Sequence, residues 1–174
     1  HPELGATKAV FLNLNNAATT SSSYWNDTAP TSSVFSVAGD TSTNNSGGMI
    51  AYCFSEIQGY SKYASYKGNA NADGTFVYTG FKPAWVMIKR TDSADNWMLY
   101  DNKRDTINPQ AVALNPDTSG AEFSTSNTLD FLSNGFKLKS TEATTNASGG
   151  TFIFMAFAEN PFVTAGTKAA GTAR

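Results

Sequence analysis

The sequence is poor in the residue types from which most catalytic and metal sites are built. Its 174 residues include one histidine, His1, and one cysteine, Cys53. A nucleophilic triad needs a histidine beside its serine or cysteine, and zinc sites need several histidine or cysteine ligands. The sequence therefore argues against both kinds of site and against an internal disulfide. Because Cys53 lies in an apolar run, we expect it to be a small buried hydrophobe.

Charged residues and long apolar runs are also scarce. Charged residues make up 15% of the chain, with 12 basic and 14 acidic side chains and a net charge of -2. Surfaces that bind nucleic acid or anionic membranes are basic, so neither partner is expected. The longest nearly pure apolar stretch, 152–158, is far shorter than the roughly 20 residues of a membrane helix. Membrane insertion is therefore not expected.

An internal repeat organises the chain instead. Three segments recur in the same order, at a spacing of about 102 residues. The pairs are 9–13 with 111–115, 33–37 with 134–138, and 45–56 with 147–159. We therefore predict about one and a half copies of a repeat of roughly 100 residues.

The repeat predicts three parts. Residues 1–58 form the C-terminal part of a first copy, 59–162 form a complete second copy, and 163–174 form an extended tail. The first copy has no counterpart for about 40 residues at the front of the second copy. We expect those strands to be supplied from elsewhere, or the two copies to share one sandwich, because open sheet edges need cover.

The apolar segments favour strands over helices. Residues 75–78, 84–89, 96–100 and 151–158 are rich in aromatic and β-branched side chains and are bounded by turn clusters. No stretch keeps a helical period. The sequence therefore predicts an all-β fold, an antiparallel β-sandwich or jelly roll. Trp85 and Trp97 lie within these strands and are expected in the core.

The sequence also resembles a known family. The run 68–90, together with 130–138 and 156–162, resembles a module of tailed-phage virion proteins, especially of marine and cyanobacterial phages. Residues 24–37 resemble the matching stretch of the preceding repeat. The resemblance implies a concanavalin A-like (laminin G-like) β-sandwich on the virion surface. It implies no catalytic residues.

The positions of the glutamates in the sequence bear on whether the chain is a glycan-cleaving enzyme. Glycosidases need two carboxylates across the scissile bond, and concanavalin-like folds host some of them. No glutamate stands in the Glu-x-Asp-x-x-Glu pattern of laminarinase-like enzymes. Glu56 and Glu159 occupy the same place in the two copies, which favours a repeated strand-end charge over an acid catalyst. We therefore expect no enzymatic activity.

One loop imitates the start of a calcium site. Asn69, Asn71 and Asp73 alternate ahead of Gly74, as in an oxygen-rich calcium loop. The twelfth position is Gly80 rather than glutamate, so the EF-hand interpretation fails. Two interpretations of this loop remain open: a looser calcium site and a plain turn. No other cofactor is expected.

Aromatic side chains in polar stretches are the candidate binding residues. The set is Tyr24, Trp25, Tyr60, Tyr63 and Tyr66. Aromatic faces stack on sugars and provide large contact areas, so a host glycan or receptor patch is one interpretation. The other interpretation is that these side chains cover the seam between the two copies.

Together these features predict a non-enzymatic structural protein of a phage virion, a tail fibre or another host-contacting appendage. It would assemble with copies of itself and with other virion proteins at the virion surface. A capsid decoration or head-fibre protein is an alternative. A glycan-cleaving enzyme and a repeat of a bacterial surface adhesin are further alternatives.

Overall fold

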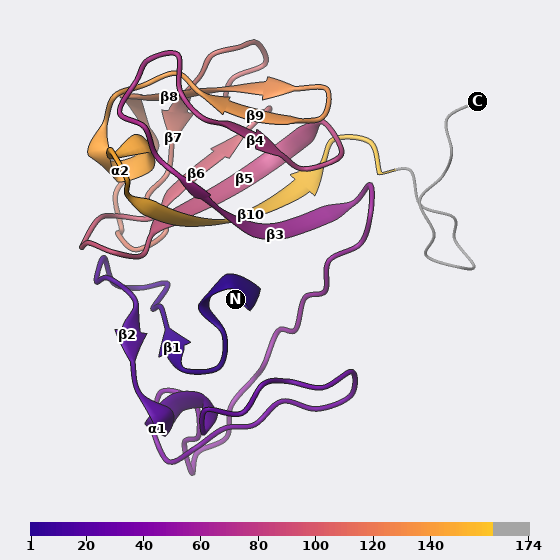
Figure 1. Cartoon of the computed structure of the whole chain (residues 1–174), viewed down its shortest axis with the longest axis vertical. Coiled ribbons are helices and arrows are strands. Elements are labelled where there is room, and N and C mark those ends of the chain that lie inside the picture. Colours follow the sequence, from indigo (N-terminus) through magenta and orange to yellow (C-terminus); the bar gives the residue numbers. More distant parts are fainter. Residues whose placement is uncertain (162–174) are drawn as a thin grey trace.

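Two antiparallel sheets packed face to face form the larger part of the molecule (Figure 1). A computed structural model describes residues 1–161, and the predicted tail at 163–174 lies outside them. The first sheet has the order β3-β10-β5-β6, with bounds Ser61–Lys67, Thr151–Ala158, Pro83–Arg90 and Met98–Asp101. The second has the order β4-β9-β8-β7, with bounds Phe76–Tyr78, Gly135–Leu138, Phe123–Leu132 and Gln110–Ala113. The expected all-β fold class is confirmed.

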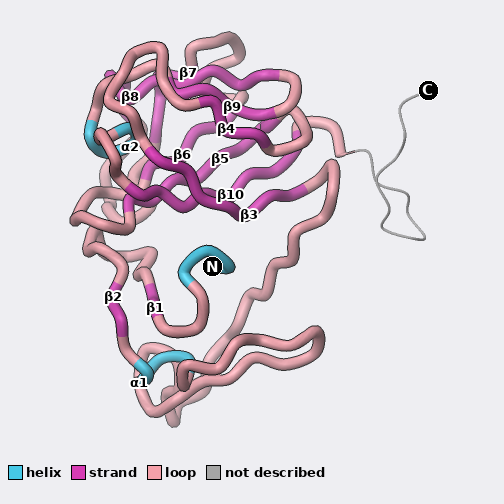
Figure 2. The backbone as a smooth tube through the Cα atoms, viewed as in Figure 1, coloured by secondary structure: helices cyan, strands magenta, loops and turns pink. Residues whose placement is uncertain are grey.

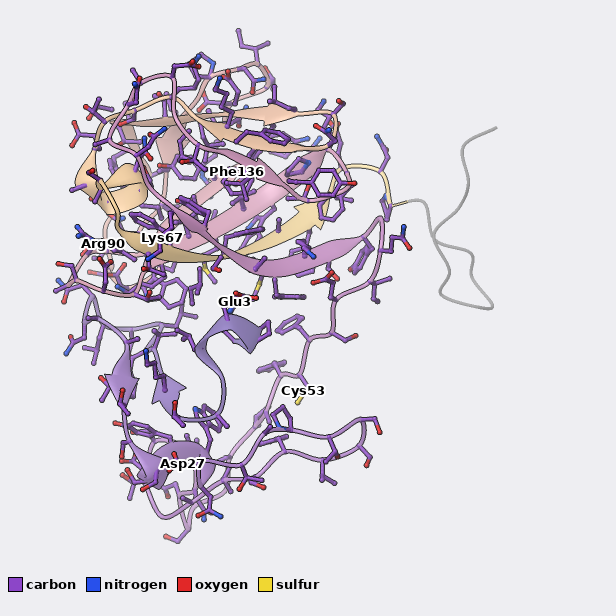
Figure 3. The ribbon with its side chains drawn as sticks, viewed as in Figure 1. Glu3, Asp27, Cys53, Lys67, Arg90 and Phe136 are labelled. Carbon is purple, nitrogen blue, oxygen red and sulfur yellow. The ribbon has the colours of Figure 1, made fainter. Side chains whose placement is uncertain are left out.

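Alternating side chains build the core between the two sheets. On β10, Phe152 and Phe154 point inward and are almost fully buried, while Phe157 lies on the outer face. The ring of Tyr66 stacks on Phe152 at 5.0 Å, and the ring of Phe136 meets Phe154 edge-on at 5.2 Å. Phe136 lies between the sheets in Figure 3. Burial of these rings supplies much of the apolar area that stabilises the sandwich.

The four predicted strands correspond to β4, β5, β6 and β10, whereas β3, β7, β8 and β9 were not predicted as strands. β3 is an edge strand with the sequence Ser-Lys-Tyr-Ala-Ser-Tyr-Lys, and several of its side chains face solvent. β8 is equally polar, with Ser and Thr at most of its first positions. Polar outward positions hide the period-two pattern that identifies a half-buried strand.

The N-terminal region, residues 1–58, forms no comparable sheet. It contains η1 (Pro2–Leu4), a two-residue pairing of β1 (Lys8–Ala9) with β2 (Thr19–Thr20), and the short helix α1 (Ser22–Trp25). The rest is loop, as Figure 2 shows. This region lies beside the first sheet, below it in the view of Figure 1.

A buried lysine fastens the first part of this region to the sandwich. The Lys89 ammonium donates to the carbonyl oxygens of Asn15 (3.1 Å), Arg90 (2.8 Å) and Asp95 (2.8 Å). Burial lowers the pKa of Lys89. The indole N–H of Trp97 donates to Phe11 O at 2.9 Å. Segment 11–15 is therefore held against the β5–β6 end of the sandwich.

Three expectations about single residues have mixed outcomes. Trp97 is buried, as predicted, with 7% of its surface exposed. Trp85 is only half-buried, because Val86 and Ile88 face the core and alternation turns Trp85 to the outer face. Cys53 is exposed rather than buried, because residues 49–56 have no neighbouring strand. The predictions for Trp85 and Cys53 were wrong.

Candidate functional site

Aromatic side chains gather on the outer face of the first sheet. The ring of Phe157 lies 5.5 Å from Trp85, 5.8 Å from Tyr60 and 6.3 Å from Tyr63. Phe54, from the N-terminal region, lies 6.3 Å from both Tyr63 and Phe157. We call these five residues the outer aromatic cluster. It covers the contact between the N-terminal region and the sandwich.

An open hollow of about 530 Å3 lies at one end of this cluster. It is lined by Ala84, Trp85, Asp101, Asn102, Lys103 and Arg104. The β5–β6 ladder brings these residues together, because Trp85 pairs with Asp101 and the Asn102 N–H donates to Ala84 O at 3.0 Å. Asp101 then closes the turn, since its Oδ1 accepts the backbone N–H groups of Lys103 and Arg104.

Ion pairs fix most of the charged groups around the hollow. Arg104 pairs with the Asp101 carboxylate, and its Nε lies 2.9 Å from Glu122 Oε2. Asn102 donates to Glu159 Oε1 at 2.8 Å. Lys103 makes no ion pair with any residue in the part of the chain that the structure describes. The hollow thus presents an aromatic ring, an amide and a free ammonium group to a ligand.

Lysine side chains hold both of the repeated glutamates, of which Glu159 follows the end of β10 and Glu56 lies in a loop. Glu56 pairs with Lys62 at 2.7 Å, and Glu159 pairs with Lys82 at 2.7 Å. The hydrogen bond from Lys82 lowers the pKa of Glu159. A glycosidase acid needs the opposite shift, because it must carry a proton near neutral pH. This environment does not suit Glu159 for general acid catalysis.

The predicted aromatic binding residues do not form one patch. Tyr66 and Tyr63 are buried, with 7% and 8% of their surfaces exposed, because Tyr66 packs between the sheets and Tyr63 packs against Phe54 and Phe157 on the outer face. The Tyr66 hydroxyl donates to Thr145 O at 2.7 Å inside the core. As a surface binding residue, Tyr66 was predicted wrongly, since its side chain packs between the sheets.

The other four aromatics divide between two places. Tyr60 and Tyr63 belong to the outer aromatic cluster, at the contact between the N-terminal region and the sandwich. Tyr24 and Trp25 lie on α1, where Tyr24 contacts Phe11 at 5.6 Å and the Trp25 indole donates to Lys8 O at 3.2 Å. Sequence reasoning missed the hollow because the register of the β5–β6 pair, not chain proximity, brings Trp85 to Asp101.

The calcium-like loop uses its side-chain oxygens within the protein. Asn69 Oδ1 accepts from the Asn71 N–H at 3.0 Å, and Asn71 Oδ1 accepts from the Asp73 N–H at 2.8 Å. The Asp73 carboxylate pairs with Lys137, which lowers the pKa of Asp73. Within residues 1–161 no three His, Cys, Asp or Glu side chains are grouped to hold a metal ion. This geometry is that of a plain turn, and calcium binding stays a prediction.

Fold and surface together define an all-β protein with a shallow aromatic and polar hollow at one sheet end. Residues 1–161 match the family described as "Domain of unknown function (DUF7483)", and the chain belongs to that family. No curated protein and no solved structure matches the chain. Across the described residues, the helices are too short or too polar to cross a membrane.

Proposed function

We propose that the chain is a non-enzymatic structural module of a phage virion, in a tail fibre or another host-contacting appendage, and that it binds a host surface saccharide at the hollow beside Trp85. The observation that carries the binding proposal is the half-buried Trp85 ring beside Asn102 and Lys103, whose ammonium group has no ion-pair partner among residues 1–161. A pyranose ring stacks on an aromatic face while amides bind its hydroxyls. The ammonium group of Lys103 would form an ion pair with an acidic substituent on the sugar.

The virion part of the proposal is supported by the family resemblance and by the character of the surface. A β-sandwich with 15% charged residues and no charge blocks offers little for nonspecific adhesion outside the cell. A capsid decoration protein would share these properties. Attachment to host cells separates the two roles, because only a host-contacting appendage requires it.

The experiment compares binding of the purified chain and its variants to host cells and to an array of surface polysaccharides. Trp85→Ala is expected to weaken binding at least about tenfold, equivalent to about 1.4 kcal/mol. Tyr78→Ala is the matched control, because Tyr78 is an exposed aromatic on β4 of the other sheet. Its binding should equal that of the unchanged chain.

Each other outcome rejects part of the proposal. Equal binding by the Trp85 and Tyr78 variants would place the ligand elsewhere. A chain that coats capsids and never attaches to cells would be a decoration protein. Release of reducing ends from the polysaccharides would make it an enzyme.

A further inference from the structure

One turn of the N-terminal region repeats several hydrogen bonds of a turn of the sandwich. Residues 38–48 match 140–150 at a constant spacing of 102, and the second segment contains helix α2 (Ala143–Asn146). Three hydrogen bonds recur in the two turns. Asn44 Nδ2 donates to Ala38 O at 2.8 Å, as Asn146 Nδ2 donates to Ser140 O at 2.7 Å. The backbone bonds Asn44 N to Asp40 O and Gly48 N to Asn45 O, of 2.8 and 3.0 Å, correspond to Asn146 N to Glu142 O and Gly150 N to Ala147 O, of the same lengths. The sequence repeat therefore has a local structural counterpart.

In the sandwich, this turn receives the segment that follows β3. Gly68 N donates to Gly150 O at 3.0 Å, and Asn69 N donates to Asn146 Oδ1 at 2.9 Å. Ala70 N donates to Asn146 O at 2.8 Å. A side chain at position 68 would place its Cβ 2.3 Å from a backbone oxygen of the turn, so the approach requires glycine. The turn is a socket for segment 68–71.

The matching socket in the N-terminal region holds no such segment. Asn44 is exposed, whereas Asn146 is fully buried. Among the described residues, none donates a hydrogen bond to Asn44 Oδ1, Asn44 O or Gly48 O. These three oxygens are the counterparts of the acceptors that hold segment 68–71.

The segment that follows this socket is unpaired as well. Residues 50–56 are the sequence counterparts of 153–159, and β10 pairs with β3 on one side and β5 on the other. Ile50, Tyr52 and Phe54 are instead 80%, 81% and 61% exposed. Both neighbours of β10 come from residues 61–90, for which the N-terminal region has no counterpart. The exposed segment is thus the one for whose two expected partner strands the N-terminal region has no counterpart.

We propose that turn 38–48 and segment 49–56 form a docking surface for another polypeptide segment of the β3–β6 type, equivalent to residues 59–102. Such a segment would fill the empty socket and flank segment 49–56 on both sides. At the spacing of 102, residue 1 is the counterpart of residue 103, so a copy of 59–102 fused ahead of residue 1 would be placed to reach the socket. This inference does not depend on saccharide binding.

A second copy of the chain does not fit this surface. Within its sandwich β5 is paired on both sides, and β3 and β6 are edge strands with one free side each, so it has no spare segment that could fill the socket and flank 49–56 on both sides. Large apolar side chains left open on a monomer normally mark an interaction site, and an unpaired strand is a template for another strand. The occupant must therefore bring additional strands.

The reactivity of the Cys53 thiol reports whether this docking surface is occupied. Its counterpart in β10 is Ala156, which is fully buried, whereas Cys53 is exposed on the segment drawn away from the sandwich in Figure 3. Completion of a second sandwich would enclose the Cys53 thiol. A buried thiol reacts far more slowly with a disulfide reagent than an exposed one.

The experiment adds a second copy of residues 59–102 before His1, directly or through a short Gly/Ser linker. Reaction of Cys53 with Ellman's reagent is expected to slow at least about tenfold relative to the unfused chain. The control fusion carries Gly68→Val in the added copy only, which blocks entry into the socket. Its Cys53 should react as fast as in the unfused chain.

The original sandwich at 59–161 serves as an internal folding control, monitored by the protection of its β10 amides against hydrogen exchange. With that sandwich folded, an unchanged Cys53 rate in both the direct and the linker fusions would overturn the proposal. Protection of Cys53 in the unfused chain through a concentration-dependent dimer would also overturn it, in favour of a second copy.

Discussion

At the scale of single residues, the core tyrosines show how burial is tied to protonation. Tyr66 is enclosed between the sheets, with its ring on Phe152 and its hydroxyl donating to Thr145 O. Burial raises the pKa of Tyr66 and that of Tyr100 well above the usual value for tyrosine, because a phenolate would be poorly solvated there.

These raised pKa values predict a loss of stability in alkali. Below about pH 10 both tyrosines are neutral in the folded and unfolded chains. Above it the unfolded chain releases these protons and the folded chain holds them, so the free energy of unfolding falls as pH rises toward the folded pKa. Each group contributes up to about 1.4 kcal/mol per pH unit.

Urea unfolding between pH 8 and pH 11 measures this effect, with Tyr66→Phe as the matched variant. The variant should lose about 1 kcal/mol at pH 8 through its missing hydrogen bond. Its stability should then fall less steeply above pH 10 than that of the unchanged chain. Parallel pH profiles for the two proteins would show that Tyr66 ionises equally in both states.

At the scale of elements, the two matching turns differ in what surrounds them. The amide of Asn146 donates to Asn69 Oδ1, Asn71 O and Ser140 O and accepts from Asn69 N. Asn44 keeps one of these bonds, to Ala38 O. A buried amide with all its partners holds a structure together, whereas an exposed one exchanges its bonds with water.

Paired substitutions test this difference. Asn146→Ala is expected to lower the free energy of unfolding by about 2–4 kcal/mol, because it leaves several buried groups without partners. Asn44→Ala should cost less than about 1 kcal/mol in the same urea titration. Equal costs for the two variants would mean that the first socket is filled in the chain as it stands.

The elements also show how far the sequence predicts the fold. β10 and segment 50–56 share one pattern of apolar residues, yet only β10 forms a strand, because β3 and β5 pair with it. The pattern identified both as strand candidates. It could not show that Cys53 would be exposed, since pairing between distant segments decides that.

At the scale of the whole molecule, the chain consists of a sandwich and an N-terminal region fixed to one end and one face of it. The candidate hollow arises where β5 and β6 end together, so it depends on sheet register. The sequence placed Trp85 in a strand but could not tell which face it occupied or that Asp101 lay opposite. The aromatic residues around 60–66 were noticed because they stood out locally, and two of the three are buried on β3.

The central claim is that segment 49–56 lacks the partner strands that β10 has. Hydrogen exchange of the 174-residue chain, read by mass spectrometry on peptides covering 49–56 and 151–158, tests it most directly. The account predicts rapid exchange in 49–56 and strong protection in 151–158. Comparable protection of the two segments would contradict it.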